Sequence, residues 1–390
     1  MLVGETEMPD KVNSLLPLRL MVLYWIFISA VVLQSGYALF FFARVLRLPV
    51  AVSTSVGHRA GVSIVICAKN EAAQLQKNLP AILSQQYEEP GESNFEVVVV
   101  NDASTDNTAE VLAGFAANND RLKIVTITAD APREFKGKKF ALSKGVKAAL
   151  YEHLLLTDAD CVPASDQWLG MMMAPLTQGK EIIAGYGGYN RSGGLLNAFT
   201  RWETLHTFLQ YSTYLLAGVP YMAVGRNMAC TKSVLLQAMR SDVWNEIPSG
   251  DDDLLVSIAA TNRNMAIVSD EAAFTYTDAK STWAEWARQK QRHLSTGKYY
   301  KTLPKVLLGL YGISHAALWL CFFLLVGCVG PLIALMSVRC LLYWGLWCVT
   351  AYKVKEQSLI YLFPFFDIGW LIYNFAFLPY ITLKNKQHWT

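Results

Sequence analysis

The 390-residue chain is 53% hydrophobic and 17% charged, with a mean hydropathy of +0.25. Soluble domains carry about 25% charged residues, so this composition excludes a disordered, collagen-like or coiled-coil chain and disfavours a plain soluble enzyme. The 34 basic and 31 acidic side chains leave a net charge of +3, which is too balanced for a nucleic-acid partner. Seven cysteines without C-x-x-C spacing argue against disulfides or zinc and for a reducing compartment.

The first element in chain order is a membrane anchor. An N-terminal segment covers residues 1–19, and residues 20–43 then carry no charge. As a helix this run would be about 36 Å long, enough to cross a hydrocarbon core of about 30 Å. It is too long for the apolar core of a signal peptide, so we expect an uncleaved transmembrane helix followed by a linker over 44–60.

The middle of the chain, residues 61–280, has the pattern of an α/β domain. Short apolar runs alternate with helical stretches, as expected of a doubly wound, mostly parallel sheet whose strands are buried on both faces. The expected strands are 62–67, 95–100, 123–127 and 153–157, and the expected helices are about 71–85, 106–118 and 139–151.

Polar and acidic residues follow three of these strands, at 69–71, 101–106 and 158–160. Ligands of doubly wound sheets bind beyond the carboxyl ends of the strands, so these residues mark the expected site. Carboxylates gathered at one edge repel each other unless a cation joins them. Asp106 is expected to cap the helix that begins near Asn107.

Two further segments carry clustered polar residues. Three aspartates at 251–253 follow Gly250 and precede the apolar run 254–260, where they could also be negative charge collected at a helix N-terminus. Gln289, Arg292 and His293 lie in a basic, aromatic stretch. We expect residues 281–305 to form an amphipathic segment at the membrane surface, with Arg292 functional as well.

The last part of the chain, 306–382, predicts about three transmembrane helices, near 306–327, 331–351 and 358–382, before a tail at 383–390. Arg339 and Asp367 are the charges inside these spans. One interpretation is that they form an ion pair; the other is that Arg339 extends its charged end to the membrane surface while Asp367 lines a polar cleft. Lys and Arg flanking the spans place the middle domain in the cytoplasm, which predicts a multi-pass protein of a bacterial inner membrane.

Taken together, the motifs resemble those of membrane-embedded family-2 glycosyltransferases, over about residues 61–305. The family includes cellulose, chitin and hyaluronan synthase-like and ceramide glucosyltransferase-like enzymes. The motifs that match in order are VSIVICAKNE (62–71), VVVVNDASTDNT (97–108), TDAD (157–160), GDDDLL (250–255) and QKQRH (289–293). The resemblance implies a catalytic domain of the GT-A fold, inversion at the anomeric carbon, a nucleotide-sugar donor that is a UDP-sugar, and Mg²⁺ or Mn²⁺ as cofactor.

The resemblance also implies roles on the donor side. Glu71 and Asp102 would contact the nucleoside, with capping as the alternative for Asp102. Asp160 would hold the metal, and Asp158 the metal or the donor, where the alternative is a plain aspartate turn. Lys138 would meet the diphosphate, unless residues 136–139 are only a solvated basic loop before a helix.

On the acceptor side, the resemblance makes Asp252 the catalytic base, with a one-residue ambiguity within the aspartate run. Gln289 and Arg292 would face the donor diphosphate. Asp251 and His293 are acceptor-side candidates, and His293 stands where the family has a tryptophan that stacks on the acceptor. That departure weakens the expectation of processive extension.

The sequence therefore predicts an inverting, metal-dependent transferase that moves a sugar from a nucleotide-sugar to a lipid or short glycan acceptor, in contact with membrane lipids. A processive polysaccharide synthase is the alternative within the same class. A non-enzymatic membrane scaffold with a decayed transferase domain is the alternative from another class, and the retained carboxylates argue against it.

Overall fold

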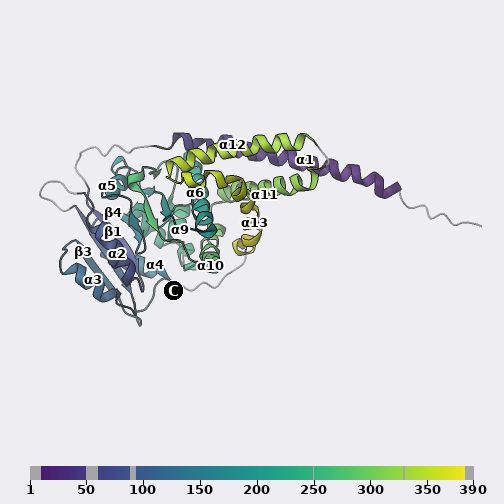
Figure 1. Ribbon diagram of the computed structural model, residues 1–390. Coiled ribbons are helices and arrows are strands. Elements are labelled where there is room, and N and C mark those ends of the chain that lie inside the picture. Colours follow the sequence, from purple (N-terminus) through teal and green to yellow (C-terminus); the bar gives the residue numbers. More distant parts are fainter. Residues whose placement is uncertain (1–9, 50–59, 88–93, 249, 328–329, 383–390) are drawn as a thin grey trace, which may run out of the picture.

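The computed structural model describes residues 10–49, 60–87, 94–248, 250–327 and 330–382 (Figure 1). Residues 1–9, most of the predicted linker and the predicted tail 383–390 lie outside the described residues. Figure 1 shows an α/β domain at one end and long helices that extend away from it at the other.

The α/β domain is built on a seven-stranded sheet of order β3-β2-β1-β4-β8-β6-β9. The first four strands are parallel, and β8 runs antiparallel to both of its neighbours. Their bounds are β1 Val62–Ala68, β2 Phe95–Asp102, β3 Leu122–Ile127, β4 His153–Asp158, β6 Ile182–Ala184, β8 Met228–Thr231 and β9 Met265–Ile267. The mostly parallel α/β sheet is thus confirmed, with the four expected strands at one side of it.

Helices cover both faces of the sheet, because successive side chains of a buried strand point to opposite faces. Ile64 and Ile66 of β1 join the cluster that contains Leu79 of α2, whereas Val65 joins the cluster that contains Phe140 of α4. The helices of this domain are α2 Ala72–Leu83, α3 Thr108–Ala116, α4 Lys138–Ala148, α5 Trp168–Met173, α6 Leu195–Leu216, α7 Lys232–Met239, α8 Asp242–Glu246, α9 Asp251–Ala259 and α10 Trp283–Leu294.

A small second sheet, of order β5-β10-β7, borders the main one. Its strands are β5 Val162–Pro163, β7 Gly187–Tyr189 and β10 Thr275–Thr277. Short 3-10 helices complete the chain: η1 Phe42–Arg47, η2 Leu176–Gln178, η3 Glu271–Ala273, η4 Gly297–Tyr299 and η5 Gln357–Leu362. Only residues 159–161 separate β4 from β5. The segment 158–161 is therefore attached to the main sheet at one end and to the small sheet at the other.

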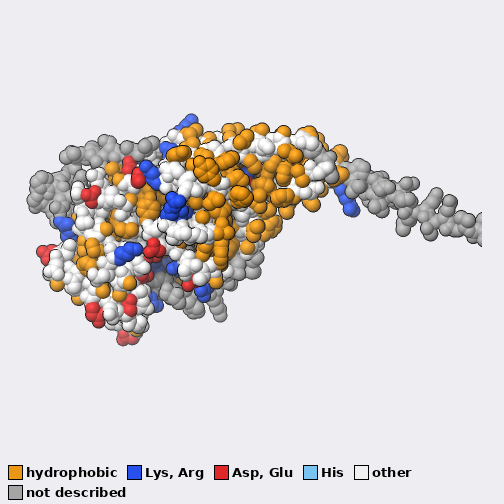
Figure 2. Space-filling view, in the orientation of Figure 1, with side chains coloured by type: hydrophobic (Ala, Val, Ile, Leu, Met, Phe, Trp, Pro, Cys, Tyr) orange, Lys and Arg blue, Asp and Glu red, His pale blue; other side chains and the backbone are white. Residues whose placement is uncertain are grey.

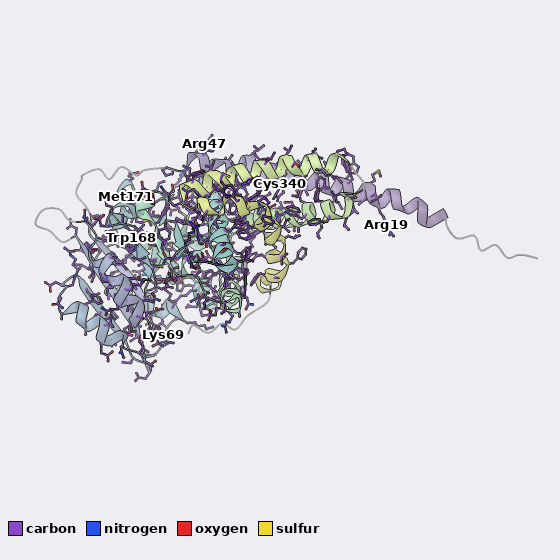
Figure 3. All side chains as sticks on the ribbon, in the orientation of Figure 1. Arg19, Arg47, Lys69, Trp168, Met171 and Cys340 are labelled. Carbon is purple, nitrogen blue, oxygen red and sulfur yellow. The ribbon has the colours of Figure 1, made fainter. Side chains whose placement is uncertain are left out.

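Four stretches are long and apolar enough to cross a membrane: Leu18–Arg47, Thr302–Leu325, Pro331–Lys353 and Gln357–Phe377. They overlap or coincide with α1 Asp10–Phe40, α11 Thr302–Leu325, α12 Pro331–Lys353 and α13 Phe363–Thr382. Figure 2 shows hydrophobic side chains gathered over these helices, as expected of a surface that faces lipid. Arg47 lies beside the α/β domain and Arg19 toward the opposite end of α1 (Figure 3).

A buried polar cluster joins all four membrane helices. Asp367 of α13 forms an ion pair with Arg339 of α12 and accepts a hydrogen bond from Trp319 Nε1 of α11 at 3.1 Å. Arg339 Nη2 also donates to Gln34 Oε1 of α1 at 3.0 Å, and Gln34 Nε2 donates to Ser314 Oγ at 2.8 Å. Arg339 and Asp367 therefore form an ion pair in the structure, in agreement with the first of the two interpretations of the sequence.

Candidate active site

The three predicted polar segments meet at one edge of the main sheet. Asp158, the last residue of β4, stands opposite Cys67 of β1, and Ala68 stands opposite Asn101 of β2. Because these strands are parallel and in step, the residues that follow them emerge side by side. The placement inferred from the sequence is confirmed at this edge.

The turns after β1 and β2 are locked together by side chains. The backbone N–H of Asn70 donates to Ser104 Oγ at 2.9 Å, and that of Thr105 donates to Asn70 Oδ1 at 2.8 Å. Asp106 accepts from the backbone N–H of Thr108, the first residue of α3, at 3.0 Å and from that of Ala72, the first residue of α2, at 3.2 Å. Asp106 thus accepts from an N–H at the start of each of two helices, although Asn107 and not Asp106 occupies the N-cap position of α3.

Asp102 is fully buried at the end of β2, where Arg133 binds both of its carboxylate oxygens. The two bonds measure 2.6 Å to Oδ1 and 3.1 Å to Oδ2. Arg133 lies in the stretch between β3 and α4, so the partner comes from a segment 31 residues away. This bidentate pair leaves Asp102 outside the lining of the cavity described below.

Asp158, Asp160 and the Cys161 thiol form a group whose possible ligand atoms lie within 4.8 Å of one another. Burial and then the negative charge of Asp158 raise the pKa of Asp160. Burial and the charges of Asp160 and Asp158 also raise the pKa of the half-buried Glu71, to about 7. Crowded carboxylates that resist ionisation fit a divalent cation with oxygen ligands, and the donor set suits Mg²⁺ or Mn²⁺.

Lys138 and Lys139 open α4 and point to different parts of the site. Lys138 forms an ion pair with Asp158, and the lysine charge outweighs burial, so that the pKa of Asp158 is lowered. Lys139 is fully buried and donates to the carbonyl oxygens of Trp244 and Ile247, both at 2.8 Å. Burial lowers the pKa of Lys139 to about 8. The basic stretch is thus not simply a solvated loop.

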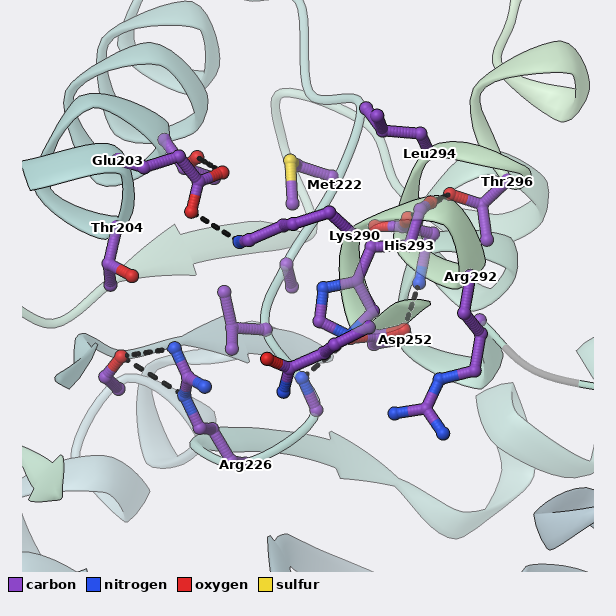
Figure 4. A pocket seen from close by; sticks show the side chains of 18 of the residues that line it. Glu203, Thr204, Met222, Arg226, Asp252, Lys290, Arg292, His293, Leu294 and Thr296 are labelled. Carbon is purple, nitrogen blue, oxygen red and sulfur yellow. Dashed lines mark hydrogen bonds and ion pairs between the residues drawn. The ribbon is translucent and has the colours of Figure 1, made fainter. Parts of the chain in front are cut away.

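These groups open onto one cavity of about 700 Å³, which Figure 4 shows from close by. Apart from Asp102, every residue predicted for the site lines it: Glu71, Lys138, Asp158, Asp160, Asp251, Asp252, Gln289, Arg292 and His293. The same cavity continues to Tyr311 of α11 and to Trp370 and Asn374 of α13. The sheet edge and the membrane helices therefore share one enclosed space.

Asp252 lies in the first turn of α9 and is held by two backbone donors. Its Oδ2 accepts from the N–H of Gly225 at 2.7 Å, and its Oδ1 accepts from that of Asp253 at 2.9 Å. Burial, followed by the charge of Asp251, raises the pKa of Asp252 to about 6. The carboxylate is thus held in position, and its pKa lies close to neutrality, which suits a general base.

The neighbouring aspartates differ from Asp252. Asp253 is buried and accepts from Thr296 Oγ1 and from Tyr300 Oη, the latter at 3.2 Å, so it holds α9 against the segment after α10. Burial and the charge of Asp252 raise the pKa of Asp253 well above its usual range. Asp251 is half-buried and faces the cavity. Among the three, Asp252 has the position expected of the base.

Helix α10 supplies the basic wall of the cavity. Arg292 lies close enough to Asp158 to contribute to the lowered pKa of that carboxyl. Gln289 Oε1 is buried without a hydrogen-bond partner among the described residues. Burial and then the charges of Lys290 and Arg292 hold the pKa of His293 well below its usual range, so His293 is neutral. Trp283 is half exposed, in keeping with a helix near the membrane surface.

Sequence reasoning gave no chemical role to two features of the cavity. Arg226 donates from Nε and Nη2 to the carbonyl oxygen of Gly187, at 3.0 and 2.7 Å, and lies over the ring of Tyr189. Lys290 forms a buried ion pair with Glu203 of α6 (Figure 4). Glu203 is the only acidic residue of α6, and this is the signal that would have indicated it, because an unpaired buried carboxylate is costly.

A mostly parallel sheet with Asp158 and Asp160 at the end of β4 has the architecture of the GT-A fold. The fold agrees with a solved structure, the mannosyltransferase PcManGT from Pyrobaculum calidifontis in complex with GDP-Man and Mn²⁺. That structure is similar to this chain with a TM-score of 0.54 and 18% identity, over 89% of this chain and 99% of that one.

Two family profiles match the sequence: Glycosyl transferase family 2 over residues 63–235 and Glycosyl transferase family group 2 over residues 153–355. The second match covers just over half of the 390 residues, and the chain belongs to glycosyltransferase family 2. It is therefore a sugar-transferring enzyme, and the scaffold alternative falls away.

Curated relatives share part of the chain. The poly-β-1,6-N-acetyl-D-glucosamine synthase of Staphylococcus epidermidis is 32% identical over 146 residues, and that of Staphylococcus aureus strain COL is 29% identical over 148 residues. Each alignment spans 37% of this chain and 31% of the relative. Both relatives are named as polymer synthases, and this chain matches about a third of the length of each.

Proposed function

We propose that this protein is a membrane-embedded polysaccharide synthase that transfers a sugar from a UDP-sugar to the end of a growing glycan, with inversion at the anomeric carbon. The continuous cavity carries this proposal, since it joins the paired aspartates, Asp252 and the membrane helices α11 and α13. The names of the relatives make N-acetylglucosamine the first sugar to test.

The donor occupies the sheet edge in this proposal. Asp158 and Asp160 hold Mn²⁺ or Mg²⁺, which when bound would offset the charge of the diphosphate leaving group. Lys138 and Arg292 lie on the same side of the cavity and can meet the diphosphate oxygens. Glu71 borders the nucleoside, whereas Asp102 is fully buried against Arg133 and does not line the cavity, so it supports this side of the site through Arg133.

The acceptor approaches from the membrane side. Asp252 takes the proton from an acceptor hydroxyl, whose oxygen forms a bond to the anomeric carbon while the bond from that carbon to the diphosphate oxygen breaks. The products are a glycan longer by one sugar, the nucleoside diphosphate and a proton on Asp252. Attack from the face opposite the leaving group gives inversion.

The catalytic domain faces the cytoplasm in this proposal, where soluble nucleotide-sugars are made. Arg44 and Arg47 at the end of the first span, Lys301 and Lys305 before or in the first turn of the second, and Lys353 at the end of the third all lie on the side of the α/β domain. Basic residues favour the cytoplasmic side of bacterial membranes.

Purified full-length protein in lipid nanodiscs, supplied with Mn²⁺ or Mg²⁺, tests the proposal against UDP-N-acetylglucosamine, UDP-glucose and GDP-mannose. We expect turnover with one UDP-sugar and products that grow in length with time. The exposed Asp120 provides a matched control, because Asp120→Asn should leave turnover unchanged. Turnover that stops after a single sugar on a lipid would replace the polymer proposal with the lipid-acceptor one, and no turnover with any donor would refute both.

A further inference from the structure

Three consecutive residues at the start of α4 contact both the donor-side group Asp158 and the segment that leads to Asp252. Lys138 forms the ion pair with Asp158 in the paired-aspartate motif, while Gly137 and Lys139 contact the segment between α8 and α9. Gly137 has a φ of +61°, and a Cβ there would lie 2.4 Å from the carbonyl oxygen of Pro248, so only glycine permits this approach. The donor-side and base-side groups are thus attached to one short stretch of backbone.

Lys139 makes the strongest of these attachments. The last carbonyl groups of a helix lack partners within the helix, and α8 ends at Glu246. The ammonium of Lys139 donates to the carbonyl oxygens of Trp244 and Ile247 at 2.8 Å each, and it lies 5.0 Å from the centre of the Trp244 ring. A cation is favourable at a helix C-terminus, so this lysine holds the end of α8 from outside the helix.

The held segment leads directly into the catalytic helix. Ile247 is followed by Pro248 and Gly250, and Gly250 precedes α9 with a φ of +76°. A Cβ on Gly250 would lie 2.2 Å from Thr296 Cγ2, so the segment is confined on that side as well. Asp252 lies two residues further on, which leaves its carboxylate dependent on where residues 247–250 are held.

We propose that Lys139 is a positioning residue that fixes the distance between the proposed base Asp252 and the donor held at Asp158, by tying the end of α8 to the start of α4. The proposal rests on the proposed function, since it assigns the role through Asp252. Lys139 itself does not line the cavity and touches neither substrate. A small shift of α9 would leave donor binding in place while it moves the base away from the acceptor hydroxyl.

The test compares Lys139→Met with wild type and with Lys147→Met, which removes an exposed lysine of the same helix. Lys139→Met keeps the length of the side chain but cannot donate to the two carbonyl groups. We expect kcat for sugar transfer to fall about ten- to a hundredfold, as a misplacement of about 1 Å can cause. The Kd for UDP with Mn²⁺ should stay within about twofold, and Lys147→Met should behave as wild type.

Hydrogen exchange gives a readout apart from activity. Within 247–253, the backbone amides of Ile247 and of residues 250–253 should exchange faster in Lys139→Met, while those of β1 stay as in wild type. Lys139→Arg, which can still donate to both carbonyl groups, should restore most of the kcat. If Lys139→Met does not fold, Lys139→Leu, which also lacks a donor, must show the same separation of kcat from UDP binding.

Three results would overturn the inference. One is an unchanged kcat in Lys139→Met, another is a parallel loss of UDP binding and transfer, and the third is unaltered exchange at 247–253. A wild-type protein that binds UDP yet transfers no sugar would instead refute the proposed function, while faster exchange in the variant would still support the tie between α8 and α4.

Discussion

Replacing Asp367 with asparagine removes the negative charge that faces Arg339 among the membrane helices. Asparagine has the same shape and can still accept the hydrogen bond from Trp319 Nε1, so the change is mainly the loss of charge. Arg339 is then a buried cation that faces no carboxylate, with Gln34 Oε1 at 3.0 Å as its acceptor on α1. The variant isolates the ion pair from the rest of the cluster.

The magnitude follows from the burial of both partners. Arg339 is 0% and Asp367 5% exposed, and removal of one partner from a buried pair costs about 3–5 kcal/mol. The hydrogen bonds from Arg339 to Gln34 and from Trp319 to residue 367 survive, so we expect a cost at the lower end of this range, about 3 kcal/mol. At about 2 °C per kcal/mol for a chain of this size, Tm should fall by roughly 6 °C. Replacing both partners, with Arg339→Leu added, should cost less than either single change, because no charge is stranded.

Thermal unfolding of the detergent-solubilised protein, followed by tryptophan fluorescence, measures this. Arg19→Leu is the matched control, because Arg19 is an exposed cation near the start of the first span and its loss should leave Tm within about 1 °C. A double variant whose Tm loss equals the sum of the two single losses would mean that the two charges do not interact, and would refute the pairing.

Three further outcomes are expected at the catalytic site. Asp160→Asn should abolish the transfer that Mn²⁺ supports, as a metal titration would show; a retained Mn²⁺ response would assign the metal elsewhere. The rate of transfer should fall about tenfold per pH unit below pH 6, where Asp252 becomes protonated and can no longer accept a proton. His293→Gln should leave this pH dependence unchanged, because His293 is already neutral. Gly225→Ala should lower kcat several-fold without a change in Tm, because the new Cβ would lie 3.2 Å from Asp252 Oδ2; unaltered kcat would mean that the position of this carboxylate is not critical.

The parts of the molecule that the sequence predicted are those with a local pattern. Strands β1, β2 and β4 are largely apolar runs followed by polar turns, and both properties are visible within about ten residues of chain. The membrane helices follow in the same way from their length without charge. Strands β6, β8 and β9 were missed because each is three or four residues long, too short for a periodicity to identify.

Long-range pairing within the α/β domain was the other feature that could not be predicted, in contrast to the pair of Arg339 and Asp367 among the membrane helices. Arg133 reaches Asp102 from 31 residues away, and Lys290 reaches Glu203 from 87 residues away. Such contacts depend on how the sheet and helices fold together, and no spacing in a single sequence encodes them. The role of Lys139 could not be predicted for the same reason. Its neighbour Lys138 has almost the same sequence context, yet Lys138 binds Asp158 whereas Lys139 binds the end of α8.

The removal of one carboxylate charge tests the central claim most directly. Asp252→Asn keeps the shape of the side chain and an oxygen for the N–H of Gly225, but asparagine cannot take a proton from an acceptor hydroxyl. With UDP-N-acetylglucosamine and Mn²⁺, or with whichever UDP-sugar supports turnover, the account predicts that transfer falls at least about a hundredfold while the Kd for UDP stays within about twofold. Transfer by Asp252→Asn at the wild-type rate would contradict the account.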